Sequence, residues 1–348
     1  MKRFLSTSLG LALVLLASAS KAATCYSFTQ EHVDLLALQW NAASNTLGLM
    51  ASDDDHGGAL YASNQCVVVC PESMKFALPG GTPLGNEGDP LWILPQNPYS
   101  GVPYVGVSAE SIPAGAFGDP MTIRLTRVEG PGQFLLWQTV EFGQFEIRMD
   151  TRDGIDSSDF LSIPVGGHAH YNWGFTTSGV YRAYFQAEGR LTGQTTNTVS
   201  PETPFTFHIL PLRPFEIWTA TNWPCECATE IIAAGADPDG DGIVNVLEYA
   251  FGNDPHTPPA THLPAVALVS TEGTNYGALR YVQAAQATDL DFEVHAAGGL
   301  GAPTTVLTNI LSIIPNGSTA TVTVRDVLPA TQAPQRFYQL RVTLRTHE

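Results

Sequence analysis

The pattern of apolar and polar residues divides the chain into two strand-rich parts that flank a short helical one. From about Thr24 to Leu212, short runs of β-branched and aromatic residues are separated by turns rich in Pro, Gly, Asn and Asp. Regularly spaced strands of this kind are typical of an antiparallel β-sandwich. We therefore expect a mostly β protein whose N-terminal domain, residues 24–212, is such a sandwich.

The part from residue 213 to 259 has a helical pattern instead. An alanine-rich segment at 228–236 and apolar residues at near-helical spacing in 244–251 predict two short helices. The strand pattern then returns, and it predicts a small separate β-domain at 260–348. The strands expected in that domain are 265–270, 277–283, 290–295, 318–327 and 335–343.

The N-terminus has the order of charged, apolar and small residues found in secretory signal peptides. Lys2 and Arg3 precede an apolar run at 9–17, and small residues follow up to Ala23. The run is shorter than the roughly 20 residues that span a bilayer, and we expect no transmembrane helix in the mature chain. We predict that residues 1–23 are a signal peptide and that the protein is secreted or on the cell surface, extracellular or periplasmic.

The charge of the mature chain narrows the range of partners. Removing the first 22 residues takes away three positive and no negative side chains, so the formal net charge goes from -17 to -20. Nucleic acid binding needs clustered Lys and Arg to displace counterions. Lys75 is then the only lysine, and the arginines are scattered. We expect no nucleic acid partner and instead an unknown surface or extracellular ligand.

The five cysteines predict disulfide bonds in an exported protein, and the odd count leaves at least one free thiol or an intermolecular bond. Cys66 and Cys70 flank three valines, while Cys225 and Cys227 form a C-x-C pair. Neither spacing is the C-x-x-C of zinc or redox sites. The spacing does not determine the pairing, and local disulfides are the simplest interpretation.

The stretch from Asp237 to Glu248 matches the twelve-position EF-hand calcium loop. Such loops take carboxylates from positions 1, 3, 5 and 12, a backbone carbonyl from position 7, and a contact often made through water from position 9. Gly242 provides the sharp turn at position 6. The predicted calcium ligands are Asp237, Asp239, Asp241, Ile243, Asn245 and Glu248. With a single loop and short helices beside it, we expect calcium to be a structural clamp rather than a signal.

A second metal site is suggested by histidines. His168 and His170 are two residues apart, which on a strand directs both imidazoles to one face. Neutral imidazole suits zinc or copper. A third ligand could come from His32, from His56 or from an aspartate at 53–55. The alternative is that these histidines only brace a turn by hydrogen bonds.

Motifs of common enzymes are absent from the sequence. There is no G-x-S-x-G, H-E-x-x-H or G-x-x-x-x-G-K-[ST] pattern. A pair of carboxylates that hydrolyses glycans would leave no fixed spacing. The first hypothesis is therefore a non-enzymatic binding or structural module with a structural calcium site. The alternatives are a zinc- or copper-binding protein and a carboxylate-dependent hydrolase.

Several motifs give the first domain a resemblance to a known family. The most specific are Gly167-His-Ala-His-Tyr-Asn-Trp-Gly-Phe175 and Ser178-Gly-Val-Tyr-Arg-Ala-Tyr-Phe185, and they accompany Glu31-His-Val-Asp-Leu35 and Gly130-Pro-Gly-Gln-Phe-Leu-Leu-Trp137. Over most of residues 28–200 the chain resembles the choice-of-anchor M domain of exported bacterial surface proteins. The resemblance implies an all-β extracellular module. The following Asp-Pro-Asp-Gly-Asp-Gly loop and β-module resemble the C-terminal part of many exported bacterial proteins.

Overall fold

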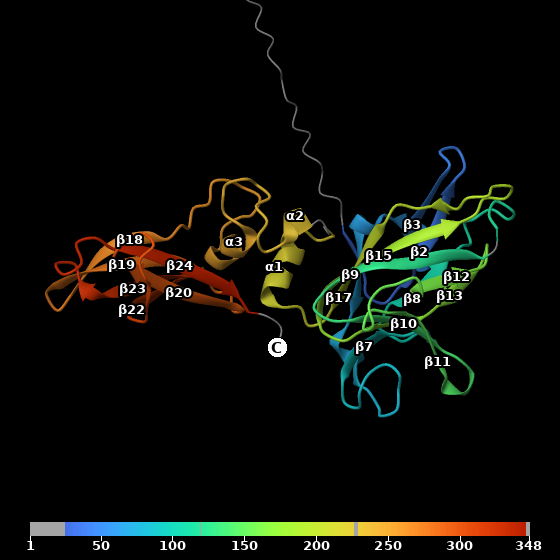
Figure 1. Cartoon of the computed structure of the whole chain (residues 1–348), viewed down its shortest axis with the longest axis horizontal. Coiled ribbons are helices and arrows are strands. Elements are labelled where there is room, and N and C mark those ends of the chain that lie inside the picture. The colour runs from blue at the N-terminus through green and yellow to red at the C-terminus, as the bar shows by residue number, and fades with distance from the viewer. Residues whose placement is uncertain (1–24, 119, 226–228, 346–348) are drawn as a thin grey trace, which may run out of the picture.

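The described residues of the protein form two β-rich bodies with three short α-helices between them (Figure 1). This computed structural model describes residues 25–118, 120–225 and 229–345, so the predicted signal peptide and Cys227 lie outside the described residues. The mostly β fold predicted from the sequence is confirmed. No helix within the described ranges is long and apolar enough to cross a membrane. The helices are α1 (Pro214–Asn222), α2 (Thr229–Ile232) and α3 (Asn245–Phe251).

Three sheets form the N-terminal body. The first contains, in spatial order, β1 (Tyr26–Phe28), β5 (Cys66–Cys70), β17 (Thr203–Ile209), β15 (Gly179–Gly189), β9 (Met121–Glu129) and β12 (Phe160–Ile163), with β16 (Thr198–Val199) beside β15. The second contains β11 (Phe145–Asp150), β10 (Phe134–Thr139), β14 (Asn172–Phe175), β7 (Pro90–Leu94) and β6 (Lys75–Ala77). The third contains β13 (His168–His170), β8 (Tyr104–Ser108), β2 (His32–Asn41), β3 (Thr46–Asp53) and β4 (Ala59–Tyr61).

The pairing of these strands is mixed rather than purely antiparallel. Strand β5 is parallel to both β1 and β17, and β2 is parallel to β8. Parallel neighbours need a crossover connection instead of a hairpin, and in each of these pairs other strands intervene along the chain. All three sheets contribute to one hydrophobic core. Phe175, for example, packs against Phe134 and Phe207 with ring centroids 5.5 and 5.1 Å apart.

The C-terminal body is built from two sheets. The first contains β18 (Ala265–Thr271), β19 (Thr274–Ala284), β23 (Thr319–Pro329) and β22 (Ile310–Asn316), and the second contains β21 (Thr305–Leu307), β20 (Leu290–Ala297) and β24 (Phe337–Leu344). Five of these strands follow the sequence prediction to within a few residues, while β21 and β22 were not predicted. Strand β22 was missed because it is an edge strand whose isoleucines are mostly exposed and do not alternate with polar residues.

The helical segment shares a hydrophobic core with the C-terminal sheets. Phe215 and Trp218 of α1 stack with their ring centroids 5.6 Å apart, and both contact Tyr249 of α3. These rings pack with Ala284 and Leu290 of the C-terminal strands. The calcium-loop segment and the C-terminal strands therefore form one packed unit.

Helix α2 is shorter than the predicted 228–236. The side-chain amide of Asn245 donates hydrogen bonds through Nδ2 to the backbone carbonyls of Ile231 and Ala233, at 2.7 and 2.9 Å. In a longer α-helix, amides four residues further along the chain would bond these carbonyls. The Asn245 side chain, on α3, thus bonds the backbone carbonyls that a longer α2 would have used.

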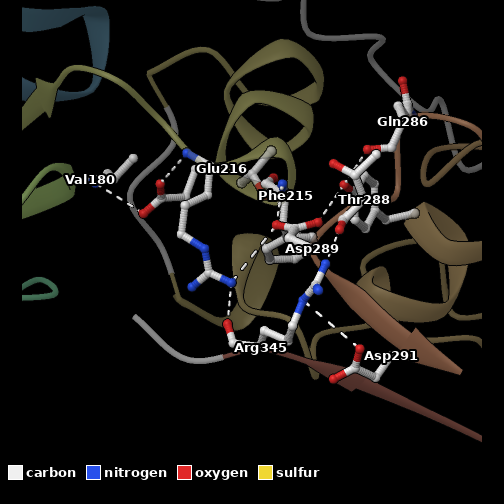
Figure 2. A network of polar contacts seen from close by, with 11 residues as sticks. Val180, Phe215, Glu216, Gln286, Thr288, Asp289, Asp291 and Arg345 are labelled. Atoms are coloured by element: carbon white, nitrogen blue, oxygen red, sulfur yellow. Dashed lines mark hydrogen bonds and ion pairs between the residues drawn. The ribbon is translucent and has the colours of Figure 1, made fainter. Parts of the chain in front are cut away.

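A polar network at the start of α1 joins the two bodies (Figure 2). Glu216 accepts a hydrogen bond from the backbone N–H of Val180 at 3.2 Å, on the N-terminal side. Asp289 of the C-terminal body accepts bonds from the N–H of Phe215 at 3.0 Å and from the hydroxyl of Tyr249 at 2.7 Å. The backbone N–H of Arg345 donates to the carbonyl of Asp289 at 3.0 Å. Helix α1 is therefore held on both sides.

The disulfide pattern differs from the local pairing expected from the sequence. Cys25 is bonded to Cys225, 200 residues away, while Cys66 and Cys70 are free and buried. The local prediction was wrong because Cys66 and Cys70 are the two ends of strand β5. Residues four apart on a strand are separated by roughly 13 Å, which exceeds the reach of a disulfide. The intramolecular disulfide is of the kind that persists in exported proteins.

Candidate metal centres

Three strands of the third sheet bring the predicted histidines together. His32 and Asp34 lie on β2, and His168 and His170 lie on β13, each pair two residues apart and so on one face of its strand. Strand β8 separates the two. In the register, Asp34 and His170 both lie opposite Gly106 of β8. The fold thus converts two distant i, i+2 pairs into one cluster.

The ligand atoms of this cluster are close enough to share one ion. The Nε2 atom of His170 is 2.8 Å from Nε2 of His168 and 3.2 Å from Nε2 of His32. Oδ1 of Asp34 is 3.1 Å from Nε2 of His168 and 4.0 Å from Nε2 of His32. Two ligand atoms on a tetrahedral zinc lie roughly 3.3 Å apart, given zinc–nitrogen distances of about 2.0 Å. The side chains present fit a tetrahedral ion with little movement.

Gly106 makes room for the cluster. A Cβ atom at this position would lie 2.1 Å from Oδ1 of Asp34 and 2.8 Å from Cε1 of His170. Such distances are far below van der Waals contact, so any side chain here would displace the ligands. Glycine weakens a strand interior and often marks a close approach there. Here the side chains that come close to Gly106 are Asp34 of β2 and His170 of β13.

Burial shifts the pKa values of Asp34 and His170 towards their neutral forms. Asp34 is only 1% exposed, and its Oδ1 has no hydrogen-bond partner. Burial raises the pKa of Asp34 to about 6, although the neighbouring histidines act in the opposite direction. Burial also lowers the pKa of His170 to about 4, aided by the positive charge that His168 and His32 would carry. A neutral imidazole offers its lone pair to a metal, and a cation would satisfy the buried carboxylate oxygen.

The Nδ1 atoms of two of the imidazoles face carboxylates, and the third imidazole stacks on an aromatic ring. Nδ1 of His32 is 3.6 Å from Asp54, and Nδ1 of His168 is 3.8 Å from Glu110. Carboxylates in this position commonly orient metal-binding histidines, with the proton on Nδ1 and the lone pair on Nε2. The ring of Tyr104 stacks on His170 with centroids 3.5 Å apart and planes 8° apart. This packing restricts rotation of the imidazole.

Sequence reasoning found the three histidines but missed Asp34 and Gly106. The aspartates considered as ligands at 53–55 have other roles, since Asp53 pairs with His56 at 2.9 Å and Asp55 accepts from the backbone N–H of His32. His56 is thereby excluded from the cluster. A usable signal was present, because His32 and Asp34 are polar residues two apart at the start of a strand that continues with the apolar residues 35–38.

The predicted calcium loop gathers its three aspartates. Carboxylate oxygens of Asp237, Asp239 and Asp241 all lie within 4.8 Å of one another. Asp237 also accepts hydrogen bonds from the N–H groups of Gly240 and Gly242, both at 3.0 Å. Both glycines have left-handed φ angles of 75° and 90°, which other residues adopt reluctantly. The loop is therefore folded around its carboxylates.

Three predicted calcium ligands lie outside the group of aspartates: Ile243, Asn245 and Glu248. Glu248 and Asn245 are fully buried on α3, and both carboxylate oxygens of Glu248 and Oδ1 of Asn245 lack hydrogen-bond partners. Burial, followed by the charges of the three aspartates, raises the pKa of Glu248 to about 7. Glu248 lies outside the tight aspartate group. Ile243 donates its N–H to Asp241 at 2.8 Å, so it belongs to the same turn. Unpartnered buried oxygens on an acidic loop suit a hard cation.

Comparisons with known proteins add no family. No family model matches the chain, and a search of curated proteins found no significant match.

Proposed function

We propose that this protein is an extracellular metal-binding module whose N-terminal body holds one zinc or copper ion through His32, Asp34, His168 and His170. The observation that carries the proposal is the buried carboxylate oxygen of Asp34, which makes no hydrogen bond and lies among three imidazoles, 3.1 Å from Nε2 of His168, with Gly106 leaving the space. A buried carboxylate is destabilising unless a cation or a proton neutralises it. An ion shared by the four side chains accounts for the whole arrangement.

The number of donors favours holding an ion over catalysis. Catalytic zinc sites keep three protein ligands and leave the fourth position to water or substrate, whereas closed sites use four. With Asp34 as fourth donor, the cluster is of the closed kind. His168 and His32 keep 24% and 28% of their side chains exposed, so an ion could enter and leave from solvent. We therefore favour metal capture or transfer over hydrolysis.

The second part of the proposal concerns calcium. The loop from Asp237 to Glu248 would bind one calcium ion and stabilise the unit formed by the helices and the C-terminal strands. Its support is the set of unpartnered buried oxygens on Glu248, Asn245 and Asp239. Asp241 also accepts from the N–H of Ala260 at 2.5 Å, so the loop is connected to the segment that leads into the C-terminal strands. Membership of the choice-of-anchor M family, and location at the bacterial surface, are part of the same proposal.

The test is titration of the metal-free mature chain, residues 24–348, with zinc and with copper while calcium saturates the loop. We expect one ion bound at micromolar or lower concentration. The double variant His168→Ala, His170→Ala should lose this binding. His56→Ala is the matched control, because His56 pairs with Asp53 outside the cluster, and it should bind as the wild type does. Absence of micromolar binding, or equal binding by the double variant, would overturn the proposal.

A further inference from the structure

A separate cavity lies on the outer face of the first sheet, under helix α1. Its floor is set by the register of the sheet, in which Arg182 lies opposite both Glu129 and Thr206, and Thr206 lies opposite Val67. Residues directly opposite one another project to the same face. On β17, Phe205 and Phe207 point into the core, which leaves the alternate residue Thr206 on the outer face.

The roof of the cavity comes from the helical segment and is mostly apolar. Phe215, Ala220 and Trp223 contribute from α1 and its end, and Ile232 contributes from α2. The volume is about 350 Å³, within the range of small-molecule sites. A neighbouring cavity of about 290 Å³ shares Ala220 with it. The roof is fixed in place by the bond from Val180 to Glu216 and by the disulfide of Cys225.

The floor presents polar groups that have no partner in the protein. The hydroxyl of Thr206 is buried, with the residue 4% exposed, and it makes no hydrogen bond. The Nε atom of Arg182 is likewise buried without a hydrogen-bond partner. His208 also lines the cavity, and burial lowers its pKa to about 4, so the ring is neutral. Unmade hydrogen bonds of this kind are costly in a native fold and call for an explanation.

The free groups on this floor can all donate hydrogen bonds, whereas the acidic groups are already bonded. Glu216 accepts from the N–H groups of Val180 and Arg213. Glu129 accepts from the hydroxyl of Tyr184 at 3.2 Å and lies 3.7 Å from the guanidinium of Arg182. What remains is a guanidinium N–H, a hydroxyl and a neutral imidazole beneath an apolar roof. The complementary molecule has oxygen acceptors at one end and an apolar body.

We propose that this cavity binds a small amphipathic carboxylate, with its carboxylate on Arg182 and Thr206 and its apolar body under Phe215 and Trp223. A carboxylate would satisfy both unpartnered donors through charge-assisted hydrogen bonds. The apolar body would fill the space against the aromatic roof. This site is on a different sheet from the metal cluster, so the inference does not depend on the metal proposal.

The test is calorimetric titration of the mature chain with hexanoate, octanoate and benzoate, and with octanol as a probe that lacks the carboxylate. We expect saturable binding of at least one acid, with octanol at least tenfold weaker than octanoate. Quenching of tryptophan fluorescence should accompany binding, since Trp223 lines the cavity. No binding of any acid at millimolar concentration, or octanol binding as tightly as octanoate, would overturn the proposal.

Two variants test separately the hydrogen bond to the carboxylate and the room for the apolar body. Thr206→Val keeps the shape but removes the hydroxyl, so octanoate binding should weaken about fivefold to tenfold, the equivalent of one hydrogen bond. Ala220→Leu fills the cavity from α1 and should abolish binding without lowering the melting temperature. Thr203→Val is the matched control on the same strand, since its hydroxyl bonds Pro201. Unchanged binding in both Thr206→Val and Ala220→Leu would show that the acid binds elsewhere and refute the assignment.

Discussion

Replacing Glu248 by glutamine should separate the cost of burying its carboxylate from the contribution of that carboxylate to calcium binding. The side chain is fully buried and neither carboxylate oxygen has a hydrogen-bond partner. Glutamine preserves the shape but removes the charge that a calcium ion would balance. In the absence of calcium the variant should be at least as stable as the wild type, because it no longer buries an unpaired carboxylate. In the presence of calcium the order should reverse.

The size of the calcium effect follows from mass action. Extracellular calcium modules bind at about 0.1 to 1 mM. At about 10 mM calcium and the tighter limit, binding adds about 2.7 kcal/mol to the free energy of unfolding. For a cooperative unit of roughly 130 residues this corresponds to a rise of about 10 °C in melting temperature. If Glu248→Gln weakens calcium binding about 100-fold, less than about 0.5 kcal/mol remains.

Differential scanning calorimetry of the mature chain, in calcium and in EGTA, measures this difference. The transition to follow is that of the unit containing the helices and the C-terminal strands, which share one core. Glu272→Gln, at an exposed turn between β18 and β19, is the matched control and should respond to calcium as the wild type does. A wild type without calcium-dependent stabilisation, or a Glu248→Gln variant that retains all of it, would show that Glu248 is not a calcium ligand.

Three further predictions concern the N-terminal body. Gly106→Ala should lower zinc affinity at least tenfold in titration because its Cβ would meet Asp34, whereas Gly48→Ala, whose Cβ would have no neighbour within 4 Å, should not; equal affinities would contradict this. Because burial lowers the folded-state pKa of His208 to about 4, the unfolded chain takes up a proton below about pH 6.5 that the folded chain excludes, so stability should fall by about 1–3 kcal/mol between pH 6.5 and 4. Urea unfolding should show a smaller loss in His208→Gln, and an identical loss would contradict the assignment. Burial also raises the pKa of Cys66 and Cys70 to about 12, so both thiols should react with a disulfide reagent only after denaturation.

What the sequence could predict was decided by how local each feature is. The calcium loop is contiguous, and its Asp and Gly positions carry both the turn geometry and the ligand chemistry, so the sequence indicated where its aspartates converge. The C-terminal strands β19 and β20 were located because their apolar runs end at clear turns. In these places the residues that determine the structure are neighbours along the chain.

The missing parts of the prediction depend on long-range register. Asp34 joins the histidines only because β8 lies between β2 and β13 with Gly106 opposite both ligand strands. Nothing in the spacing of the sequence specifies that strand order. The bond between Cys25 and Cys225 has the same origin, since it joins residues that the fold alone brings together. The parallel pairing of β5 with β1 and β17, and of β8 with β2, likewise reflects crossovers that short strand patterns do not encode.

We propose above that one transition-metal ion is held by residues from β2 and β13. A crystal structure of the mature chain with one equivalent of zinc, with anomalous data collected on either side of the zinc absorption edge, tests it most directly. We expect a single strong anomalous peak from an ion bonded to the Nε2 atoms of His32, His168 and His170 at about 2.0–2.1 Å, and to Asp34. A crystal whose zinc peak lies elsewhere, with Asp34 and the three histidines bound to no ion, would contradict it.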